Sequence, residues 1–159
     1  MHVLLHEPEI PGNTGSIARL CAGTGVQLHL SGKLGFSLDA KHVRRAGLDY
    51  WPNVKLSVHD NYESAIKTLG NKRYWLLSAR AERSIWDVEF GCDDVFIFGC
   101  ESKGLPDSIK SQYPLSQHLK IPTNNLIRSH NLANSVGIVM YEAIRQNRQF
   151  FPDIDENNT

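Results

Sequence analysis

The sequence has no excess charge of either sign and no long apolar run. Its 17 Lys and Arg side chains are balanced by 17 Asp and Glu side chains, so global charge gives no support to nucleic-acid binding. A membrane-spanning helix needs a run of about 18 or more apolar residues, and the sequence contains none. The first residues carry neither a basic region nor a small-residue cleavage site, so we expect no secretory signal and no membrane contact.

Cysteines and metal-binding patterns are equally sparse. The three cysteines, Cys21, Cys92 and Cys100, form an odd number without the spacing of a metal site. His2 and His6 share one face of the first expected strand, but no acidic or cysteine residue adjoins them at ligand spacing. We therefore expect a reduced, cytoplasmic protein that holds no metal ion.

The remaining composition is that of an ordinary globular domain. With 159 residues, of which 41% are hydrophobic, the chain can bury one substantial core. No internal repeat or low-complexity linker divides it. We expect a single domain over residues 1–150 and a loosely held polar tail over residues 151–159.

Short apolar stretches alternate with amphipathic ones along the chain. We expect strands at residues 3–5, 26–30, 54–58, 74–77, 94–98 and 118–121, and helices at residues 15–22, 40–46, 62–69 and 131–146, with a short helix opening at Pro106. This alternation predicts an α/β fold in which helices flank a parallel sheet on both faces.

Three polar segments lie where an expected strand gives way to a helix, at residues 7–15, 99–106 and 128–135. Ligands of open α/β sheets bind at this edge. A simpler interpretation is local: Asn13 or Thr14 would cap the first helix, and Ser129 or Asn131 the last one, without any role in a site. The presence of three such segments favours a ligand site.

The last expected helix is apolar over a wide arc, which indicates burial on two sides. One side can face the sheet, and the other can face either the rest of the chain or a second copy; we favour a homodimer. Its two stripes consist of Leu132, Val136, Val139 and Ala143, and of Ala133, Gly137, Met140 and Ile144.

Basic residues are clustered although the total charge is zero. Lys41, Arg44 and Arg45 fall within one short stretch, and Arg80 and Arg83 form a second group. Such runs are either solvated surface or a contact for an anionic partner.

Four motifs follow one another in order. The first comprises Glu7-Pro8-Glu9-Ile10-Pro11 and Asn13-Thr14-Gly15, and the second Leu34-Gly35-Phe36 and Arg44-Arg45-Ala46-Gly47-Leu48-Asp49-Tyr50. The third is Gly99-x-Glu101-x-x-Gly104-Leu105-Pro106, and the fourth is Arg128-Ser129-x-Asn131-Leu132-x-Asn134, followed by Tyr141-Glu142-Ala143. Together they resemble the SPOUT superfamily of RNA methyltransferases, and most closely its small single-domain tRNA (cytidine/uridine-34 2′-O)-methyltransferases, which act on the wobble nucleotide of leucine tRNAs.

The resemblance implies a SPOUT fold with a C-terminal trefoil knot, which is an exception to the rule that chains do not thread loops. It implies S-adenosylmethionine (AdoMet) as methyl donor, tRNA as partner, and a homodimer formed through the first and last helices. The cofactor-binding residues that it implies are Leu77, Ser78, Gly99, Glu101, Gly104, Ile121, Ser129 and Asn134.

The resemblance also implies roles in catalysis. Arg19 would lower the pKa of the ribose hydroxyl by its charge, since a guanidinium is a poor base. Ser129 and Asn131 would orient the ribose or Arg19, Asn13 would fix its loop, and Glu101 would hold backbone or substrate groups. The residues expected to contact tRNA phosphates are Lys41, Arg44, Arg45 and Arg128.

The sequence departs from the family pattern at Cys100, Lys103, His130 and Ala133, where Pro, Arg, an apolar residue and Ser are common. A nucleophilic Cys100 lacks an apparent paired base, and Ser129 lacks the G-x-S-x-G elbow of a hydrolase. Two alternatives stay open: ribose methylation of ribosomal RNA or of another tRNA position, and a non-catalytic RNA-binding module with the same fold.

Overall fold

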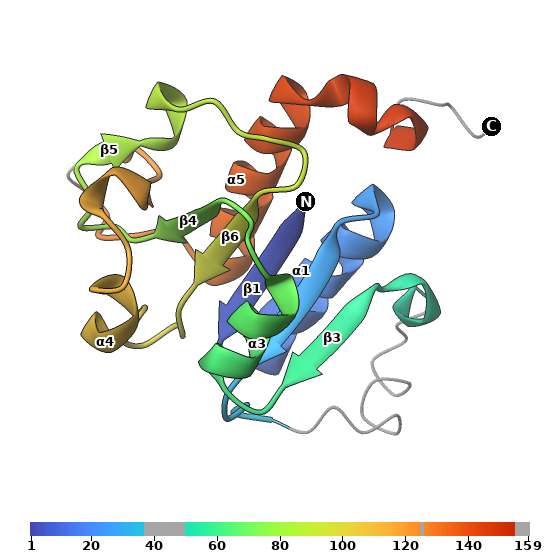
Figure 1. Ribbon diagram of the computed structural model, residues 1–159, viewed down its shortest axis with the longest axis horizontal. Helices are drawn as coiled ribbons and strands as arrows, with labels where there is room; N and C mark the ends of the chain where they lie inside the picture. Colours follow the sequence, from blue (N-terminus) through green and yellow to red (C-terminus); the bar gives the residue numbers. More distant parts are fainter. Residues whose placement is uncertain (37–49, 125, 155–159) are drawn as a thin grey trace.

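A computed structural model describes residues 1–36, 50–124 and 126–154, and its centre is a parallel sheet (Figure 1). Over these residues the sheet has seven strands in the order β3-β2-β1-β6-β4-β7-β5. Every neighbouring pair is parallel, which confirms the predicted α/β class. The strands are β1 (His2–His6), β2 (Gln27–Ser31), β3 (Leu56–His59), β4 (Tyr74–Leu77), β5 (Arg83–Ser84), β6 (Val95–Phe98) and β7 (His118–Lys120).

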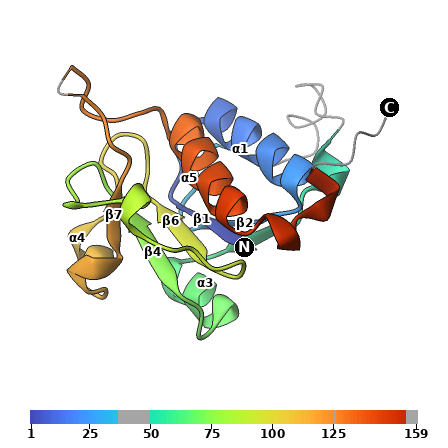
Figure 2. The same ribbon diagram turned by 90° about the horizontal axis from the view of Figure 1, so that it is seen from above.

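Helices lie on both faces of the sheet, as Figure 2 shows: α1 and α5 lie side by side on one face, and α3 lies on the other. The α-helices are α1 (Pro11–Thr24), α3 (Tyr62–Leu69), α4 (Asp107–Lys110) and α5 (Leu132–Gln146). The 3-10 helices are η1 (Trp51–Asn53), η2 (Ile85–Asp87), η3 (Leu115–Gln117), η4 (Arg148–Phe150) and η5 (Pro152–Ile154).

Successive side chains of β1 contribute to two hydrophobic clusters, one on each face of the sheet. Val3 and Leu5 are buried in the cluster that includes α1 and α5, whereas Leu4 is buried in the cluster that includes α3 and α4. Successive side chains of a strand point to opposite faces, so a strand covered on both sides must be apolar throughout. The uniformly buried stretch of β6 follows the same rule.

Local signals located some element ends correctly and others wrongly. The helix over residues 62–69 is confirmed, with an Asn61–Ser64 capping box at its start and Gly70 at its end. The expected cap of the first helix was wrong: α1 begins at Pro11, and Ile10 precedes it without a side-chain cap. The helix also ends two residues later than expected, at Thr24, and Gly25 follows it in the left-handed region. The helix expected over residues 40–46 lies outside the described residues.

The edge strand β5 was missed. It is two residues long and pairs with β7, so no periodicity could reveal it. The guanidinium of Arg83 donates to the carbonyl oxygens of Ser116 and Asp87, at 3.0 and 3.1 Å. Arg83 therefore joins η2 and η3, and it does not form a free basic pair with Arg80.

Both apolar stripes of α5 are used within the chain. Val139 and Ala143 are buried, and so are Met140 and Ile144 of the second stripe, because α5 packs on α1 as well as on the sheet. Of the expected tail, Phe151 and Ile154 pack against the same core, and residues 155–159 lie outside the described residues.

A row of histidines crosses three strands on the α3 face. His29 Nε2 lies 3.2 Å from His2 Nδ1, and His29 Nδ1 lies 3.0 Å from His59 Nε2. His2 also contacts Asp93, which pairs with Lys72. Burial, followed by the nearby charges of His2, His59 and Lys72, lowers the pKa of His29 to about 4.

Candidate functional site

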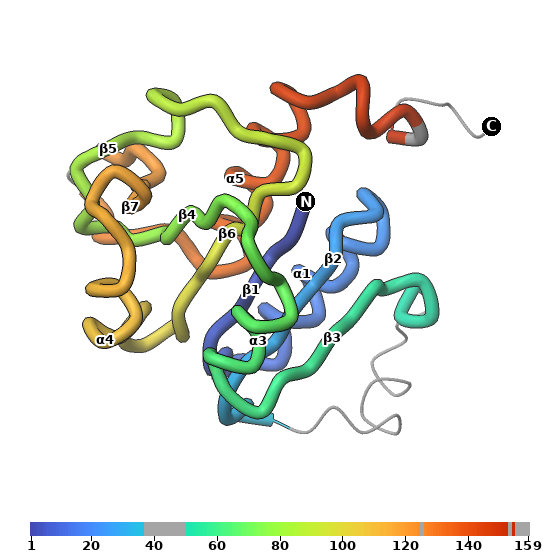
Figure 3. The backbone as a smooth tube through the Cα atoms, in the orientation of Figure 1, coloured from blue at the N-terminus to red at the C-terminus, as the bar shows by residue number. Residues whose placement is uncertain are grey.

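Loops after neighbouring strands meet at the carboxyl end of the sheet and enclose a cleft of about 1030 Å³. The loops follow β6, β4 and β7, which are adjacent in the sheet. Figure 3 shows the chain after β7 crossing from the β7 side of the sheet towards β1 before it enters α5. Residues of all three loops and of the α1 and α5 entrances line this cleft. The predicted ligand edge is therefore a physical cleft.

Glu101 is the centre of the hydrogen-bond network beside the cleft. Its Oε2 accepts from the backbone N–H of Glu9 at 2.8 Å, and its Oε1 accepts from the backbone N–H of Ile10 at 3.2 Å and from Asn13 Nδ2 at 2.8 Å. A carboxylate that meets donors alone is well matched, because it has only acceptor sites. The predicted capping role of Asn13 is thus replaced by a tertiary contact.

Asn13 and Asn131 extend this network to the last helix. Asn131 Nδ2 donates to Asn13 Oδ1 at 2.9 Å. Asn131 Oδ1 accepts from the N–H groups of Ala133 and Asn134, which makes Asn131 the cap of α5. Capping and participation in the site are therefore two uses of one side chain, because its oxygen faces the helix and its nitrogen faces α1.

A second carboxylate, which the sequence analysis missed, returns the contact in the opposite direction. Glu9 Oε2 accepts from the backbone N–H of Ser102 at 3.0 Å, and Glu9 Oε1 accepts from Ser102 Oγ at 2.7 Å. Glu101 thus binds the backbone around Glu9, while Glu9 binds the backbone beside Glu101. We refer to these reciprocal contacts of Glu9 and Glu101 as the clamp. Its only sequence signal was that both residues belong to motifs, Glu9 to the first and Glu101 to the third.

The pKa of Glu101 is lowered from its usual value. Burial acts to raise it, but the hydrogen bonds from Asn13 and from the backbone N–H groups of Glu9 and Ile10 outweigh burial. Glu101 is accordingly a fixed negative charge at neutral pH. It holds backbone and amide groups in place and is not poised to transfer protons.

The loop after β6 folds back on itself so closely that Gly99 is required. A Cβ atom at Gly99 would lie 2.0 Å from the carbonyl carbon of Gly104. Gly104 has a φ of 71°, in the left-handed region that glycine favours. Cys100 Sγ lies 3.7 Å from the carbonyl oxygen of Gly104 and 3.8 Å from Ser102 Oγ. No described base contacts this thiol, so its position fits a small loop residue.

Most of the residues expected to bind cofactor lie together around the cleft. Asn134 is the exception: it lines a smaller hollow of about 580 Å³ between α1 and α5. Those that line the cleft are Leu77, Ser78, Gly99, Glu101, Gly104, Ile121 and Ser129.

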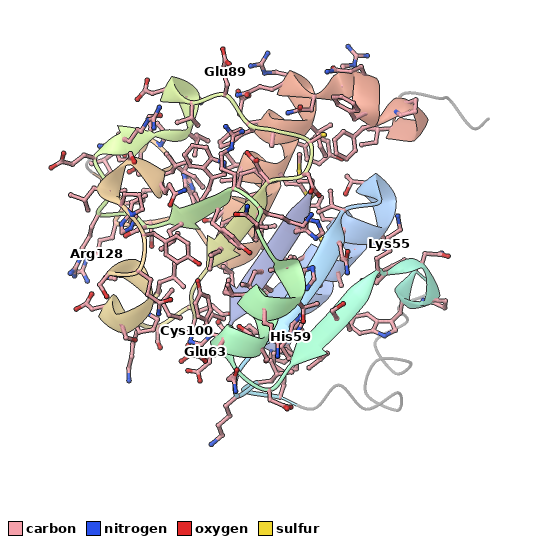
Figure 4. All side chains as sticks on the ribbon, viewed as in Figure 1. Lys55, His59, Glu63, Glu89, Cys100 and Arg128 are labelled. Atoms are coloured by element: carbon pink, nitrogen blue, oxygen red, sulfur yellow. The ribbon has the colours of Figure 1, made fainter. Side chains whose placement is uncertain are left out.

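The residues expected to meet the RNA are more dispersed. Arg128 lines the cleft and lies at the edge of the molecule in Figure 4. Arg19 is exposed but lines neither hollow; its guanidinium lies 5.0 Å from the centre of the Tyr50 ring. At 1.5 Å per residue, it is about 9 Å along α1 from Asn13. Lys41, Arg44 and Arg45 lie outside the described residues.

Two kinds of feature are absent from residues 1–36, 50–124 and 126–154. No group of His, Cys, Asp or Glu side chains there could hold a metal ion. None of the helices in this part of the chain has the length and apolar character needed to cross a membrane.

The comparisons with known proteins agree on one family. The model of the SpoU rRNA Methylase family matches residues 1–141. A tRNA (cytidine(34)-2′-O)-methyltransferase of Methylovorus glucosotrophus is 42% identical over 91% of this chain and 94% of its own length. One of Saccharophagus degradans is 43% identical, with the same two shares.

Solved structures give the same result. A structure described as giving insights into 2-OH methylation of C/U34 on tRNA is 43% identical, with a TM-score of 0.86 over 93% of this chain and 96% of that one. The SpoU methyltransferase AviRb of Streptomyces viridochromogenes, in complex with AdoMet, is 22% identical, with a TM-score of 0.77 over 94% of this chain and 61% of that one. The latter likeness concerns the fold alone.

Proposed function

This chain belongs to the SpoU rRNA Methylase family, and we propose that it transfers a methyl group from AdoMet to the ribose 2′-hydroxyl of nucleotide 34 in tRNA. The observation that carries the proposal is the match to tRNA (cytidine(34)-2′-O)-methyltransferases at about 40% identity along nearly the whole of both chains. The alternative, a non-catalytic RNA-binding module with the same fold, predicts RNA binding without methyl transfer.

The cleft fits AdoMet in size and in chemistry. It has a volume of about 1030 Å³, and glycines at 99 and 104 bring main-chain groups to its wall. Leu77, Ile121 and Leu132 supply apolar lining, while Ser78 supplies a polar group. When bound, AdoMet supplies an activated methyl group on a sulfonium centre.

The residues of the chain align and polarise the nucleophile. The row formed by Glu101, Asn13 and Asn131 joins the cofactor loop to the entrances of α1 and α5, which fixes both walls of the cleft. Ser129, at the rim, orients the ribose. Arg19 and Arg128 supply positive charge that favours ionisation of the 2′-hydroxyl and binds the flanking phosphates.

A homodimer through α1 and α5 is part of the proposal. The hollow between these helices is lined by Leu20, Gly137 and Ile138, and Ile138 is 38% exposed. Tyr141 on α5 is 49% exposed as well. A second copy packed on this face would bury these apolar groups and extend the substrate surface next to the cleft.

The finer assignments follow from the same family resemblance. We propose a trefoil knot in the segment from β6 to α5, which agrees with the position of β7 between β4 and β5 and with the path of the chain across the sheet end. Leucine tRNAs are the proposed isoacceptors, and the cytoplasm, where tRNA is used, is the proposed location.

Nucleoside mass spectrometry tests the activity. Bulk tRNA that lacks ribose methylation is incubated with the protein and AdoMet, and the product is mapped along the tRNA. We expect 2′-O-methylcytidine or a 2′-O-methyluridine at position 34 of leucine tRNAs. Methylation of ribosomal RNA alone would contradict the proposed substrate. AdoMet binding without turnover on either RNA would favour the non-catalytic module.

A further inference from the structure

The residues that line the cofactor cleft carry a net positive charge, although the chain as a whole is neutral. Arg80 follows β4, Lys103 lies in the loop after β6, Lys120 ends β7, and Arg128 lies in the loop before α5. All four side chains line the cleft, and none forms an ion pair within the described part of the chain. We refer to Arg80, Lys103, Lys120 and Arg128 as the basic belt.

The cleft has little negative charge with which to balance the belt. Glu101 is the single acidic residue among the described lining residues. Its two oxygens already accept hydrogen bonds from Asn13 and from the backbone of Glu9 and Ile10. Lys110, a fifth cation in the lining, pairs with Asp107. Asp107 also lies near enough to Arg80 for their charges to interact, but it does not line the cleft. The belt therefore leaves the lining with an excess of positive charge.

This field favours the demethylated product over the cofactor. AdoMet carries a sulfonium, an ammonium and a carboxylate, so its net charge is positive, whereas the demethylated product S-adenosylhomocysteine has lost the sulfonium charge and is neutral. Two unit charges about 10 Å apart in water change an affinity about twofold, and less when salt screens them. The field of the belt therefore disfavours AdoMet relative to the product until an anion neutralises it.

On the premise of the proposed function, we propose that Arg80, Lys103 and Lys120 act with Arg128 as a phosphate-binding belt for tRNA, and that RNA phosphates on this belt shift cofactor preference from S-adenosylhomocysteine towards AdoMet. Phosphates supply the anion that the cleft lacks, and Arg and Lys bind them well. Because linkage is reciprocal, AdoMet in turn strengthens RNA binding relative to the product, which promotes release of methylated tRNA.

The test combines two binding measurements on the full-length protein. The first is the salt dependence of tRNA affinity, for the wild type and for a triple variant, Arg80→Gln, Lys103→Gln and Lys120→Gln. Each lost phosphate contact lowers the slope of log affinity against log salt by about 0.7 to 0.9, so we expect a total decrease of about 2 to 3. The control Lys67→Gln removes an exposed lysine from the last turn of α3, which does not line the cleft, and leaves the slope unchanged.

The second measurement is calorimetric affinity for AdoMet and S-adenosylhomocysteine, with and without a saturating anticodon stem-loop. In the wild type, we expect the stem-loop to shift the affinity ratio towards AdoMet by about threefold to eightfold. In the triple variant, where only Arg128 of the belt still holds phosphate at the cleft, we expect a clearly smaller shift, while the protein still binds both ligands.

An unchanged salt slope in the triple variant, or a cofactor ratio that does not respond to RNA in the wild type, overturns the belt and leaves the proposed methyl transfer intact. A wild-type protein that binds no tRNA overturns both proposals together.

Discussion

Two rows of hydrogen-bonded polar side chains connect different elements of this molecule, and they differ in charge and surroundings. The row of Glu101, Asn13 and Asn131 lies beside the cleft at the carboxyl end of the sheet. The row of His2, His29 and His59 crosses β1, β2 and β3 on the α3 face, and its middle member is 1% exposed. The first row contains a fixed charge, whereas the second consists of histidines whose pKa values burial lowers, so that they gain charge only in acid.

The two rows respond differently to pH: the charge of Glu101 at the cleft stays constant, whereas the charge of the histidine row changes in acid. Hydrogen bonds lower the pKa of Glu101, so its charge persists throughout the neutral range. The pKa of His29 is lowered mainly by burial, to about 4, so His29 is neutral at neutral pH and gains a proton only in acid. We therefore expect acid to weaken the histidine region of the fold before it changes the clamp at the cleft.

Acid titration of stability gives the largest expected effect. His29 has a pKa of about 4 in the folded chain and about 6.5 when unfolded, so the unfolded state binds more protons between these values. Stability is full above about pH 6.5 and declines as the pH falls towards 4. At about 1.4 kcal/mol per pKa unit, the free energy of unfolding decreases by up to about 3 kcal/mol, measurable by urea denaturation across this range.

A His29→Leu variant isolates this effect. Leucine has a similar size, cannot bind a proton, and would lie next to Leu4 of β1, its neighbour in the parallel register. We expect a distinctly flatter dependence of stability on pH, whatever the variant's absolute stability. A slope equal to that of the wild type would assign the acid sensitivity to other groups.

Replacement of Glu101 by Gln is expected to have the next largest effect, on activity. The carboxylate accepts from three donors, so an amide nitrogen in place of one oxygen faces an N–H group of the chain and cannot bond to it. We expect kcat/KM for methyl transfer to fall about 100-fold, which corresponds to about 2.7 kcal/mol. Steady-state kinetics with AdoMet and tRNA would measure it.

Glu89→Gln is the matched control for this variant. Glu89 is exposed, and Figure 4 places it at the opposite end of the molecule from Cys100 of the cleft. We expect Glu89→Gln to retain full activity, and both variants to fold with parallel far-ultraviolet spectra. A Glu101→Gln variant as active as Glu89→Gln would show that the clamp does not support catalysis.

Sequence alone predicted those features that local chemistry determines. The limits of α3 follow from a capping box and a closing glycine. The succession of strand β1 and helix α1 follows from the change in hydrophobic periodicity between them. The start of α1 was missed because the N–H groups before it are bound by Glu101, which is 92 residues away from Glu9. The two-residue strand β5 was missed for a similar reason, since only its pairing with β7 defines it.

The sequence indicated which residues lie at the candidate site, but not the hydrogen bonds that join them. The motifs indicated Asn13, Glu101 and Asn131 as site residues. Their order in one hydrogen-bonded row depends on the fold, because it requires the Asn13 amide to lie between the Glu101 carboxylate and the Asn131 amide. The role of Glu9 had no signal of its own. Its partner, Ser102, lies 93 residues along the chain, and only the folded loops bring them together.

Replacement of Glu9 by Gln gives the smallest expected effect and separates the two halves of the clamp. Ser102 can rotate its hydroxyl and accept a bond from the new amide, so Glu9→Gln loses less than Glu101→Gln, in which the opposing donors include two backbone N–H groups. We expect the KM for AdoMet to rise about tenfold while the KM for tRNA stays unchanged, because Glu9 holds the cofactor loop. A Ser102→Ala background already lacks the hydroxyl that binds Glu9 Oε1. There Glu9→Gln should add little further loss, since the glutamine oxygen can still accept from the backbone N–H of residue 102. Equal loss in both backgrounds would mean that Glu9 acts through some other group, and equal rises in both KM values would indicate general weakening of the fold.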